Sequence, residues 1–165
     1  MKIANVICAA GVSGYFNKDL EAARLGARQD GFGFIDPPVT PGFDQVLQPG
    51  QALSVMLLLE DGQVAFGDCM DVIFTGAAGR DPLFKAEAHR DVVEGPIREL
   101  LIGRDCAEFR PLAAEIEAFR QAGSQLHTAL RFGISQALLH ADALAGLKTI
   151  ILYDEGQAVR DIPGA

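Results

Sequence analysis

The sequence SVMLLLEDGQVAFGDC, residues 54–69, carries the clearest structural signal in this chain. Two runs rich in β-forming residues, 54–60 and 63–68, flank Asp61 and Gly62. An Asp-Gly pair accommodates the positive φ angles of a type I′ turn, so this spacing predicts a tight β-hairpin.

The first run of this hairpin is apolar at nearly every position. Because side chains alternate between the two faces of a strand, one face carries Leu53, Val55, Leu57 and Leu59, and the other carries Met56 and Leu58. A strand that is apolar on both faces is typical of a sheet covered on both sides. Residues 3–8 read as another strand, so we expect a small antiparallel meander.

The segment FGFIDPPVTPGFDQVLQPG, residues 32–50, has a different character. It holds four of the eight prolines of the chain. Proline fixes φ and removes a hydrogen-bond donor, so little regular structure is expected. A connection this long is disordered or functional. Its interleaved Phe32, Phe34, Ile35 and Phe43 predict that the segment packs onto something.

After Phe84 the apolar period becomes helical. Three stripes follow, with Gly95 and Pro96 expected to break the first; a shorter helix is expected over residues 18–27. The stripes are Val92, Val93, Ile97, Leu100 and Leu101; Leu112, Ile116 and Phe119; and Leu126, Leu130, Ile134, Ala137, Leu138, Ala141 and Leu144. Strands followed by helices, without alternation, predict an α+β fold.

Composition restricts the class of protein further. The 165 residues suit one domain, and 49% hydrophobic with 22% charged residues is typical of globular chains. A net charge of −8 disfavours nucleic acid and anionic membranes as partners. The start lacks a secretory pattern, and no apolar run approaches the roughly 20 residues that span a bilayer. Cys8, Cys69 and Cys106 form no CxxC pair, so we expect a soluble cytoplasmic protein with reduced core thiols.

The glycine-rich stretch TGAAGRDPLF, residues 75–84, follows the hairpin and invites a test for phosphate binding. A P-loop needs Lys and then Ser or Thr after its last glycine, but Gly79 is followed by Arg80 and Asp81. The glycine spacing of the dinucleotide-binding fingerprint is also absent. Composition favours a connector over a functional loop.

Candidate catalytic side chains are scattered. His89, His127 and His140 form no metal-binding motif, and a capping or surface role is expected for His127 at the start of a helix. Ser13 lies in GVSGY, where Tyr15 replaces the last glycine of the nucleophile elbow GxSxG. Asp68, Asp71 and Asp81 are interpreted as turn formers. The sequence shows no complete catalytic set.

Several longer motifs occur in an order that resembles a known family. They are GARQDGFGF, PGFDQV, the hairpin sequence, TGAAGRDPLF, LIGRD and LHTALRFGISQALL. Together they resemble the amino-terminal domain of methylaspartate ammonia-lyase, a member of the enolase superfamily, from Met1 to about Leu139, and the resemblance fades after Asp142. It implies a single cap domain over residues 1–165, an antiparallel β-meander followed by a helical bundle, with the catalytic barrel of the triosephosphate isomerase type absent from this chain.

The resemblance also implies a function for the whole enzyme. It would be a carbon–nitrogen lyase that eliminates ammonia from 3-methylaspartate to give mesaconate in glutamate fermentation. Mg²⁺ and the catalytic bases would be bound and supplied by the barrel, so no catalytic residue and no metal ligand is expected in this chain, which would be inactive alone. Expected partners are a barrel domain or subunit, the amino-acid substrate, and further copies in a homo-oligomer.

In such enzymes, loops of the cap close over the mouth of the barrel. By that resemblance, TGAAGRDPLF and the residues before it form a lip of the substrate pocket, with these candidate residues: Ile73, Thr75, Gly76, Gly79, Arg80 and Asp81. Arg80 and Asp81 would anchor the lip to the barrel or to each other. Ile73 replaces a glutamine of the family, which leaves a related amino acid open as substrate. The alternatives are a stand-alone or split-subunit binding module, and the cap of another enolase-superfamily lyase or dehydratase.

Overall fold

The computed structural model describes residues 1–71 and 81–151, with side chains up to residue 146. Its strands are β1 (Ile3–Lys18), β2 (Gln29–Asp30), β3 (Gly33–Phe34), β4 (Leu47–Leu59), β5 (Val64–Met70), β6 (Arg120–Gln121) and β7 (Ser124–Gln125). Its helices are α1 (Leu20–Arg24), a 3₁₀ turn η1 (Ala86–His89), α2 (Arg90–Val92), a π-helical turn η2 (Val93–Ile97), α3 (Arg98–Leu101), α4 (Phe109–Ala118) and α5 (Thr128–Ile151).

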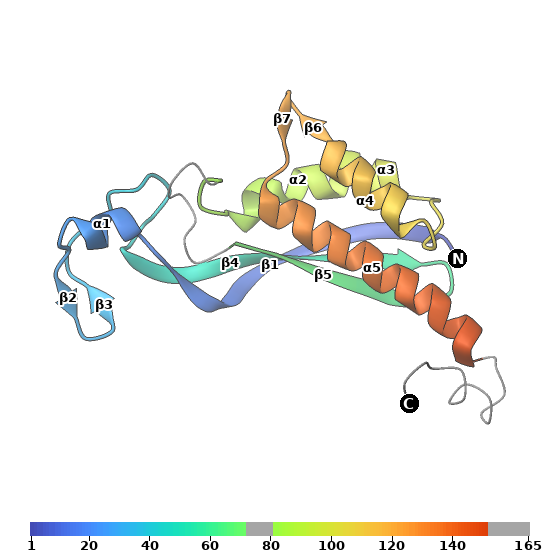
Figure 1. The fold of residues 1–165 in the computed structure, drawn as a ribbon, viewed down its shortest axis with the longest axis horizontal. Coiled ribbons are helices and arrows are strands. Elements are labelled where there is room, and N and C mark those ends of the chain that lie inside the picture. Colours follow the sequence, from blue (N-terminus) through green and yellow to red (C-terminus); the bar gives the residue numbers. More distant parts are fainter. Residues whose placement is uncertain (72–80, 152–165) are drawn as a thin grey trace.

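The main body is an antiparallel three-stranded sheet in the order β1-β4-β5, with helices packed on one side of it (Figure 1). The helix α5 lies over β4 and β5, and the helices from η1 to α3 lie over β1. The α+β prediction is therefore confirmed, and the strands of the three-stranded sheet precede the helices that pack on it.

The predicted hairpin is present, but its turn is of another type. Leu58 pairs with Val64, and the amide of Leu59 donates to the carbonyl of Gln63 (2.9 Å). Among the described residues only Gly62 in this loop has a positive φ, +85°. The strands are therefore joined by a three-residue loop with one left-handed residue, and not by a type I′ turn. A type I′ turn needs two residues with positive φ, whereas this loop needs only one, which is Gly62. A type I′ pattern appears instead at Ala122 and Gly123, between β6 and β7.

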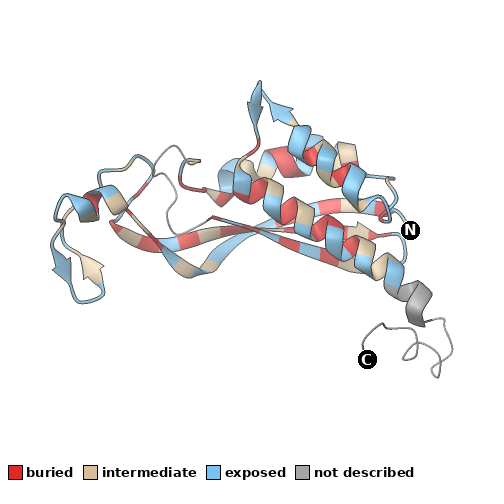
Figure 2. Ribbon diagram, in the orientation of Figure 1, coloured by how far each residue is buried: buried red, intermediate tan, exposed pale blue. Residues whose placement is uncertain are grey.

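The face of β4 that meets the helices forms the centre of the core. Leu53, Val55 and Leu57 are fully buried, as their alternation predicts, together with Ala65 and Cys69 of β5 (Figure 2). The buried stripes of the helices pack against them, notably Ile97, Leu112, Ile116, Leu130, Ile134 and Leu138. The expected break at Gly95 is confirmed, since its φ of −104° and ψ of −105° interrupt the helical backbone.

The expectation that the sheet is covered on both sides is not met within the described residues. Met56 and Leu58 point away from the helices and are half-buried, and neighbouring Ile7 and Phe66 are exposed. The local sequence pattern shows that a strand has apolar residues on both faces, but it does not identify the part of a protein that covers the second face.

Beyond the sheet, β1 and β4 continue as an arm that carries α1 and the β2–β3 hairpin (Figure 1). Residues 35–46 of the proline-rich segment have no regular structure, whereas β4 already begins at Leu47. Pro49 fits in this strand because β4 pairs there with β1 only, and pairing with β5 starts at Ala52. Phe43 is buried in the arm, whereas Phe32 and Ile35 remain exposed.

The buried carboxylate of Asp19 organises this arm. It accepts hydrogen bonds from the amides of Glu21 (3.1 Å) and Ala22 (3.2 Å) at the start of α1. It also accepts from the amides of Val39 (2.7 Å) and Thr40 (2.8 Å) in the proline-rich segment. One side chain therefore caps a helix and fixes an irregular segment.

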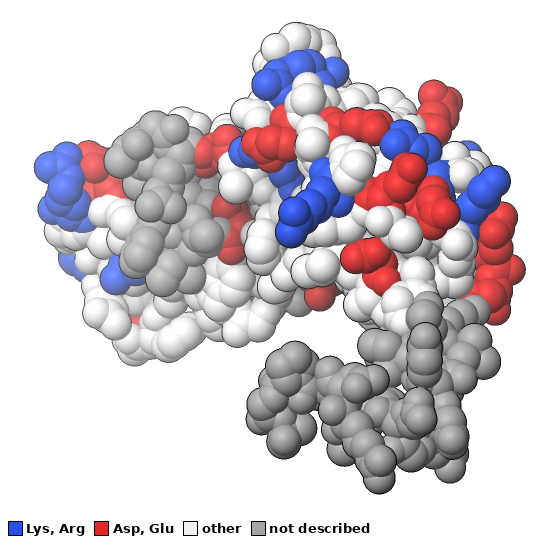
Figure 3. Space-filling view, turned by 45° about the vertical axis from the view of Figure 1, so that its right-hand side comes forward, with Lys and Arg blue, Asp and Glu red and all other residues white. Residues whose placement is uncertain are grey.

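The charge distribution on the surface and the state of the cysteines are those that the composition predicts. Acidic and basic side chains are interspersed over the helical part of the face drawn in Figure 3. Cys8, Cys69 and Cys106 are buried and free, as predicted. In the described part of the chain, no helix is both long and apolar enough to cross a membrane.

Candidate functional site

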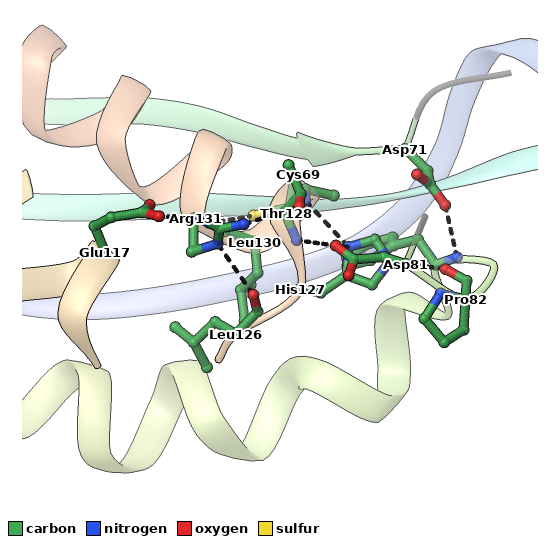
Figure 4. A network of polar contacts seen from close by, with 12 residues as sticks. Cys69, Asp71, Asp81, Pro82, Glu117, Leu126, His127, Thr128, Leu130 and Arg131 are labelled. Carbon is green, nitrogen blue, oxygen red and sulfur yellow. Dashed lines mark hydrogen bonds and ion pairs between the residues drawn. The ribbon is translucent and has the colours of Figure 1, made fainter. Parts of the chain in front are cut away.

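The candidate site lies where the chain leaves β5 and returns to the helical layer (Figure 4). Of the six predicted lip residues, the structure describes Asp81. The other five, Ile73, Thr75, Gly76, Gly79 and Arg80, lie outside the described residues. What the structure does describe is the anchoring of the two ends of this segment.

Asp71 fixes the outgoing end. It follows β5 directly, is 8% exposed, and its Oδ2 accepts a hydrogen bond from the amide of Phe84 (2.8 Å). This contact joins the residues on either side of the segment 72–80. Asp71 therefore accepts a hydrogen bond from an amide 13 residues away, a longer-range contact than the turn-forming role that we predicted for it.

Asp81 fixes the returning end to α5. Its Oδ2 accepts a hydrogen bond from the amide of Thr128 (2.6 Å), the first residue of that helix. The first amides of a helix have no partner within the helix, and its dipole favours negative charge at this end. Burial raises the pKa of Asp81, but hydrogen bonds from Thr128, with His127 and Arg131 nearby, outweigh burial and hold this pKa below its usual value.

His127 caps the same helix, which is one of the two roles, capping or surface, predicted for it. Its Nδ1 accepts a hydrogen bond from the amide of Ala129 (3.1 Å), and its Nε2 lies 2.8 Å from the carbonyl oxygen of Pro82. An acceptor role for Nδ1 places the proton of the neutral ring on Nε2, which therefore donates to Pro82. The ring thus joins α5 to the residue that follows Asp81.

Three rings pack together beneath these contacts. His89 stacks on the buried ring of Phe84 with centroids 4.8 Å apart, and His127 meets Phe84 edge-on at 5.1 Å. The two imidazoles lie 5.6 Å apart. Burial, and then the neighbouring His127, lowers the pKa of His89 below its ordinary value of 6.5. Sequence analysis missed this cluster, since nothing in the local pattern relates His89 to His127.

Arg131 braces the start of α5 from its other side. Its guanidinium donates to Glu117 of α4, to the carbonyl of Leu126 (3.1 Å) and to the hydroxyl of Thr128 (2.9 Å). The helix end that receives Asp81 is therefore held by α4 as well. This residue, too, was not singled out from the sequence.

The chemistry of the cluster is that of an anchor. A carboxylate beside an imidazole can form a general base, and Asp81 Oδ2 lies 3.8 Å from His127 Nδ1. Here, however, Nδ1 accepts from Ala129 and Nε2 contacts Pro82, so neither nitrogen is available to a substrate. Within the described residues, no three His, Cys, Asp or Glu side chains lie together as possible metal ligands.

The fold and the site together define a mixed α+β domain whose polar cluster joins the residues before η1 to the start of α5. Comparison with known proteins identifies the family: the family described as "Methylaspartate ammonia-lyase N-terminus" matches residues 1–155. The chain belongs to this family.

Individual relatives agree with this assignment. Methylaspartate ammonia-lyase of Clostridium tetanomorphum is 43% identical over 170 residues, which cover 99% of this chain and 41% of that protein. The enzyme of the same name from Citrobacter amalonaticus is 48% identical over 159 residues, covering 95% of this chain and 38% of that protein. The chain thus spans about two-fifths of the length of these relatives and corresponds to their N-terminal part.

Two crystal structures have the same fold. The Mg complex of β-methylaspartase from Clostridium tetanomorphum matches with a TM-score of 0.84 and 44% identity over all of this chain and 39% of that one. The Citrobacter amalonaticus enzyme containing (2S,3S)-3-methylaspartic acid also matches with a TM-score of 0.84, at 48% identity over 95% of this chain and 39% of that one.

Proposed function

We propose that this chain is the N-terminal domain of an Mg²⁺-dependent enzyme that eliminates ammonia from 3-methylaspartate to give mesaconate. In this proposal the chain supplies a lip of the substrate pocket, and the remainder of the enzyme supplies the reacting groups. Support comes from the family assignment and from the methylaspartate ammonia-lyases that this chain resembles.

The observation that best supports a lip at residues 72–80 is that both ends of this segment are held by hydrogen bonds. Asp71 joins the outgoing end to Phe84, and Asp81 joins the returning end to Thr128. Fixing both ends of a chain segment reduces the number of conformations open to it, and so reduces the entropy that binding costs. A lip held in this way would help to exclude water and to position a substrate.

The described residues do not form a site suited to Mg²⁺, which prefers several oxygen ligands in octahedral geometry. The carboxylates of Asp71 and Asp81 both accept hydrogen bonds from backbone amides instead. We therefore propose that the remainder of the enzyme binds the metal.

The finer features follow from the family and are part of the same proposal. The chain would form a single enolase-superfamily cap over residues 1–165, paired with a barrel in a homo-oligomeric cytoplasmic enzyme of glutamate fermentation. Its substrate would be 3-methylaspartate or, given Ile73 in place of glutamine, a related amino acid.

Co-expression with the part of the Clostridium tetanomorphum enzyme that this chain does not match tests the proposal. We expect the purified pair to release ammonia and mesaconate from 3-methylaspartate, and this chain alone to release neither. The pair carrying Asp81→Ala should still form a complex of the same size but should have a lower kcat/KM, because the returning end of the lip loses its hydrogen bond to Thr128. Turnover by this chain alone, or an intact pair that releases ammonia from neither 3-methylaspartate nor a related amino acid, would contradict the proposal.

A further inference from the structure

The interior of the arm is polar, whereas that of the main sheet is apolar. Among the described residues, the buried polar or charged side chains are those of Asn17, Asp19, Gln48 and Asp71, and the first three belong to the arm. Asn17 of β1 pairs with Gln48 of β4, and Asp19, still in extended conformation, follows two residues later. Because side chains alternate along a strand, Tyr15, Asn17 and Asp19 point to the same face. Together with Gln48 they are here called the polar face of the arm.

A β-bulge directs the ring of Tyr15 onto this face. The register of β1 on β4 shifts between Val12 and Phe16, so that residues 13–15 lie opposite Gly50. Bulges change the direction in which a side chain points. A Cβ added to Gly50 would lie 3.3 Å from Tyr15 Cε2, so the ring rests against the glycine backbone.

Two side chains of the polar face have their hydrogen bonds from within the arm. In addition to its four backbone donors, Asp19 accepts a hydrogen bond from the hydroxyl of Thr40 (2.6 Å). The side-chain oxygen of Gln48 accepts from the amides of Asp44 (2.7 Å) and Gln45 (3.3 Å). These buried oxygens are therefore paired, as buried polar groups nearly always are.

The other two side chains each keep an unpaired atom. Tyr15 Oη and Asn17 Oδ1 are shielded from solvent, and neither has a hydrogen-bond partner in the part of the chain that the structure describes. Asn17 as a whole is 1% exposed. Burial, and then the nearby carboxylate of Asp71, raises the pKa of Tyr15, so its phenol keeps its proton at neutral pH. Tyr15 Oη can therefore donate and accept, whereas Asn17 Oδ1 only accepts.

The surroundings of these two atoms restrict what can pair with them. Because the chain itself shields both atoms from solvent, a large ligand or another polypeptide cannot reach them. A cation is not required, since the charge of Asp19 is already met by five hydrogen bonds. Water is small, donates and accepts, and in protein interiors makes roughly three hydrogen bonds to polar groups that otherwise lack partners.

We propose that the arm holds internal water, hydrogen-bonded to Tyr15 Oη and to Asn17 Oδ1, as a constitutive part of its polar interior. This hydration site belongs to the arm alone and does not depend on the proposed reaction. It lies near Asp71, whose side chain holds the amide of Phe84. Bound water therefore links the packing of the arm to the residue at which the segment 72–80 begins.

The test compares unfolding with a crystal structure of this chain at a resolution that reveals ordered water. Tyr15→Phe removes only the hydroxyl. If that hydroxyl binds water, its removal loses a hydrogen bond and lowers the urea midpoint. If it is unpaired, its removal relieves a buried polar group and raises the midpoint. Thr40→Val is the matched control, because it removes a hydroxyl of the same network that has a partner, Asp19.

We expect electron density for ordered water within hydrogen-bond distance of Tyr15 Oη and of Asn17 Oδ1 in the unmodified chain. Tyr15→Phe should lower the urea midpoint by about 0.5 M, in the same direction as Thr40→Val, since each change loses one hydrogen bond. No such density, or a midpoint that rises or stays unchanged in Tyr15→Phe, would overturn the proposal.

Asn17→Leu examines the second atom independently of the first. It replaces the amide with an apolar group of similar size, so it should lower the midpoint if Asn17 Oδ1 binds water and raise it if that atom is unpaired. A crystal structure of this variant should lack the water seen next to Asn17 and keep the water next to Tyr15 Oη or its direct hydrogen-bond partner. A higher midpoint in Asn17→Leu would contradict a water molecule at this residue.

Discussion

Gly67 of β5 and Gly133 of α5 face each other where the helix crosses the strand. A Cβ added to Gly67 would lie 1.9 Å from the carbonyl oxygen of Gly133, and one added to Gly133 would lie 2.4 Å from Cys69 Sγ and 2.5 Å from the Cys69 amide nitrogen. Neither side can yield easily, because the contacts are mostly with backbone atoms. This close approach lets α5 lie directly on the sheet.

Gly133→Ala is therefore expected to lower the free energy of unfolding, by about 1–3 kcal/mol, as overpacking of a core does. The matched control is Gly146→Ala in the same helix, where an added Cβ meets nothing within 4 Å. There the change should raise the free energy of unfolding by up to about 1 kcal/mol, because alanine favours helix more than glycine. Urea unfolding followed by circular dichroism measures both, and equal effects of the two changes would contradict the close-packing account.

Asp81→Ala should remove a pH-dependent contribution to stability. The folded-state pKa of Asp81 lies below its ordinary value of 3.8, so the stabilisation is present above that pH and is lost as pH falls through the folded-state pKa. At pH 7 the loss of this helix cap should cost about 0.5–1 kcal/mol, a modest value because the side chain is 39% exposed and screened by solvent.

Urea unfolding of the wild type and of Asp81→Ala at pH 7 and near pH 3 measures this difference, which should shrink at the lower pH. Asp44→Ala serves as a control, since Asp44 is exposed and caps no helix. A difference that stays constant between the two pH values would exclude the charged cap as its source.

His89 should make folding less favourable as the solution is acidified. Its pKa in the folded state is lowered from 6.5 by burial and by His127, so the unfolded chain binds a proton more readily. Stability is therefore retained above about pH 6.5 and falls as pH decreases toward the folded-state pKa of His89. An NMR titration of the ring protons should show a midpoint below 6.5, and His89→Gln should weaken the loss of stability between pH 7 and 5. A midpoint at or above 6.5 would show that the stacked ring is not desolvated.

The three cysteines should resist alkylation while the chain is folded. Burial raises the pKa of Cys8 and Cys69 to about 12 and also raises that of Cys106. The thiolate is the reactive form, so little of it is present at pH 8. Iodoacetamide labelling measured by mass spectrometry should be slow in buffer and fast in urea. Rapid labelling of Cys69 in the folded chain would contradict its burial in the contact with α5.

Much of the fold could be predicted from local pattern. The alternation of Leu53, Val55 and Leu57 identified the buried face of β4, and the spacing of Leu130, Ile134 and Leu138 identified that of α5. Each of these signals repeats within a few residues, so sequence alone suffices to detect it. The turn at Asp61 and Gly62 was predicted in the right place but with the wrong geometry, because one left-handed residue meets the requirement of a three-residue loop.

The candidate site was predicted less completely. The position of His127 predicted a capping or a surface role, and the hydrogen bond from the amide of Ala129 shows that the ring caps the helix. The stacking of His89 on Phe84, and the brace that Arg131 forms with Glu117, were not foreseen. These contacts join elements whose relative placement depends on how the whole core packs. The local spacing of apolar residues contains no information about that placement.

By itself, the sequence determined which residues form strands and helices, which of their faces are apolar, and to which family the chain belongs. These properties depend on residue types at short, regular spacings and on the order of motifs. Tertiary packing alone decided that Asp81 meets the first amide of a helix 47 residues away and that two glycines let this helix rest on the sheet. It also decided that the helices of the described part of the chain pack on one face of the sheet. The physical reason is that the hydrophobic effect is non-directional, so it stabilises the burial of an apolar face whatever partner covers it. Which distant faces pack together, and which hydrogen-bond donors meet which acceptors, depends on the path of the folded backbone.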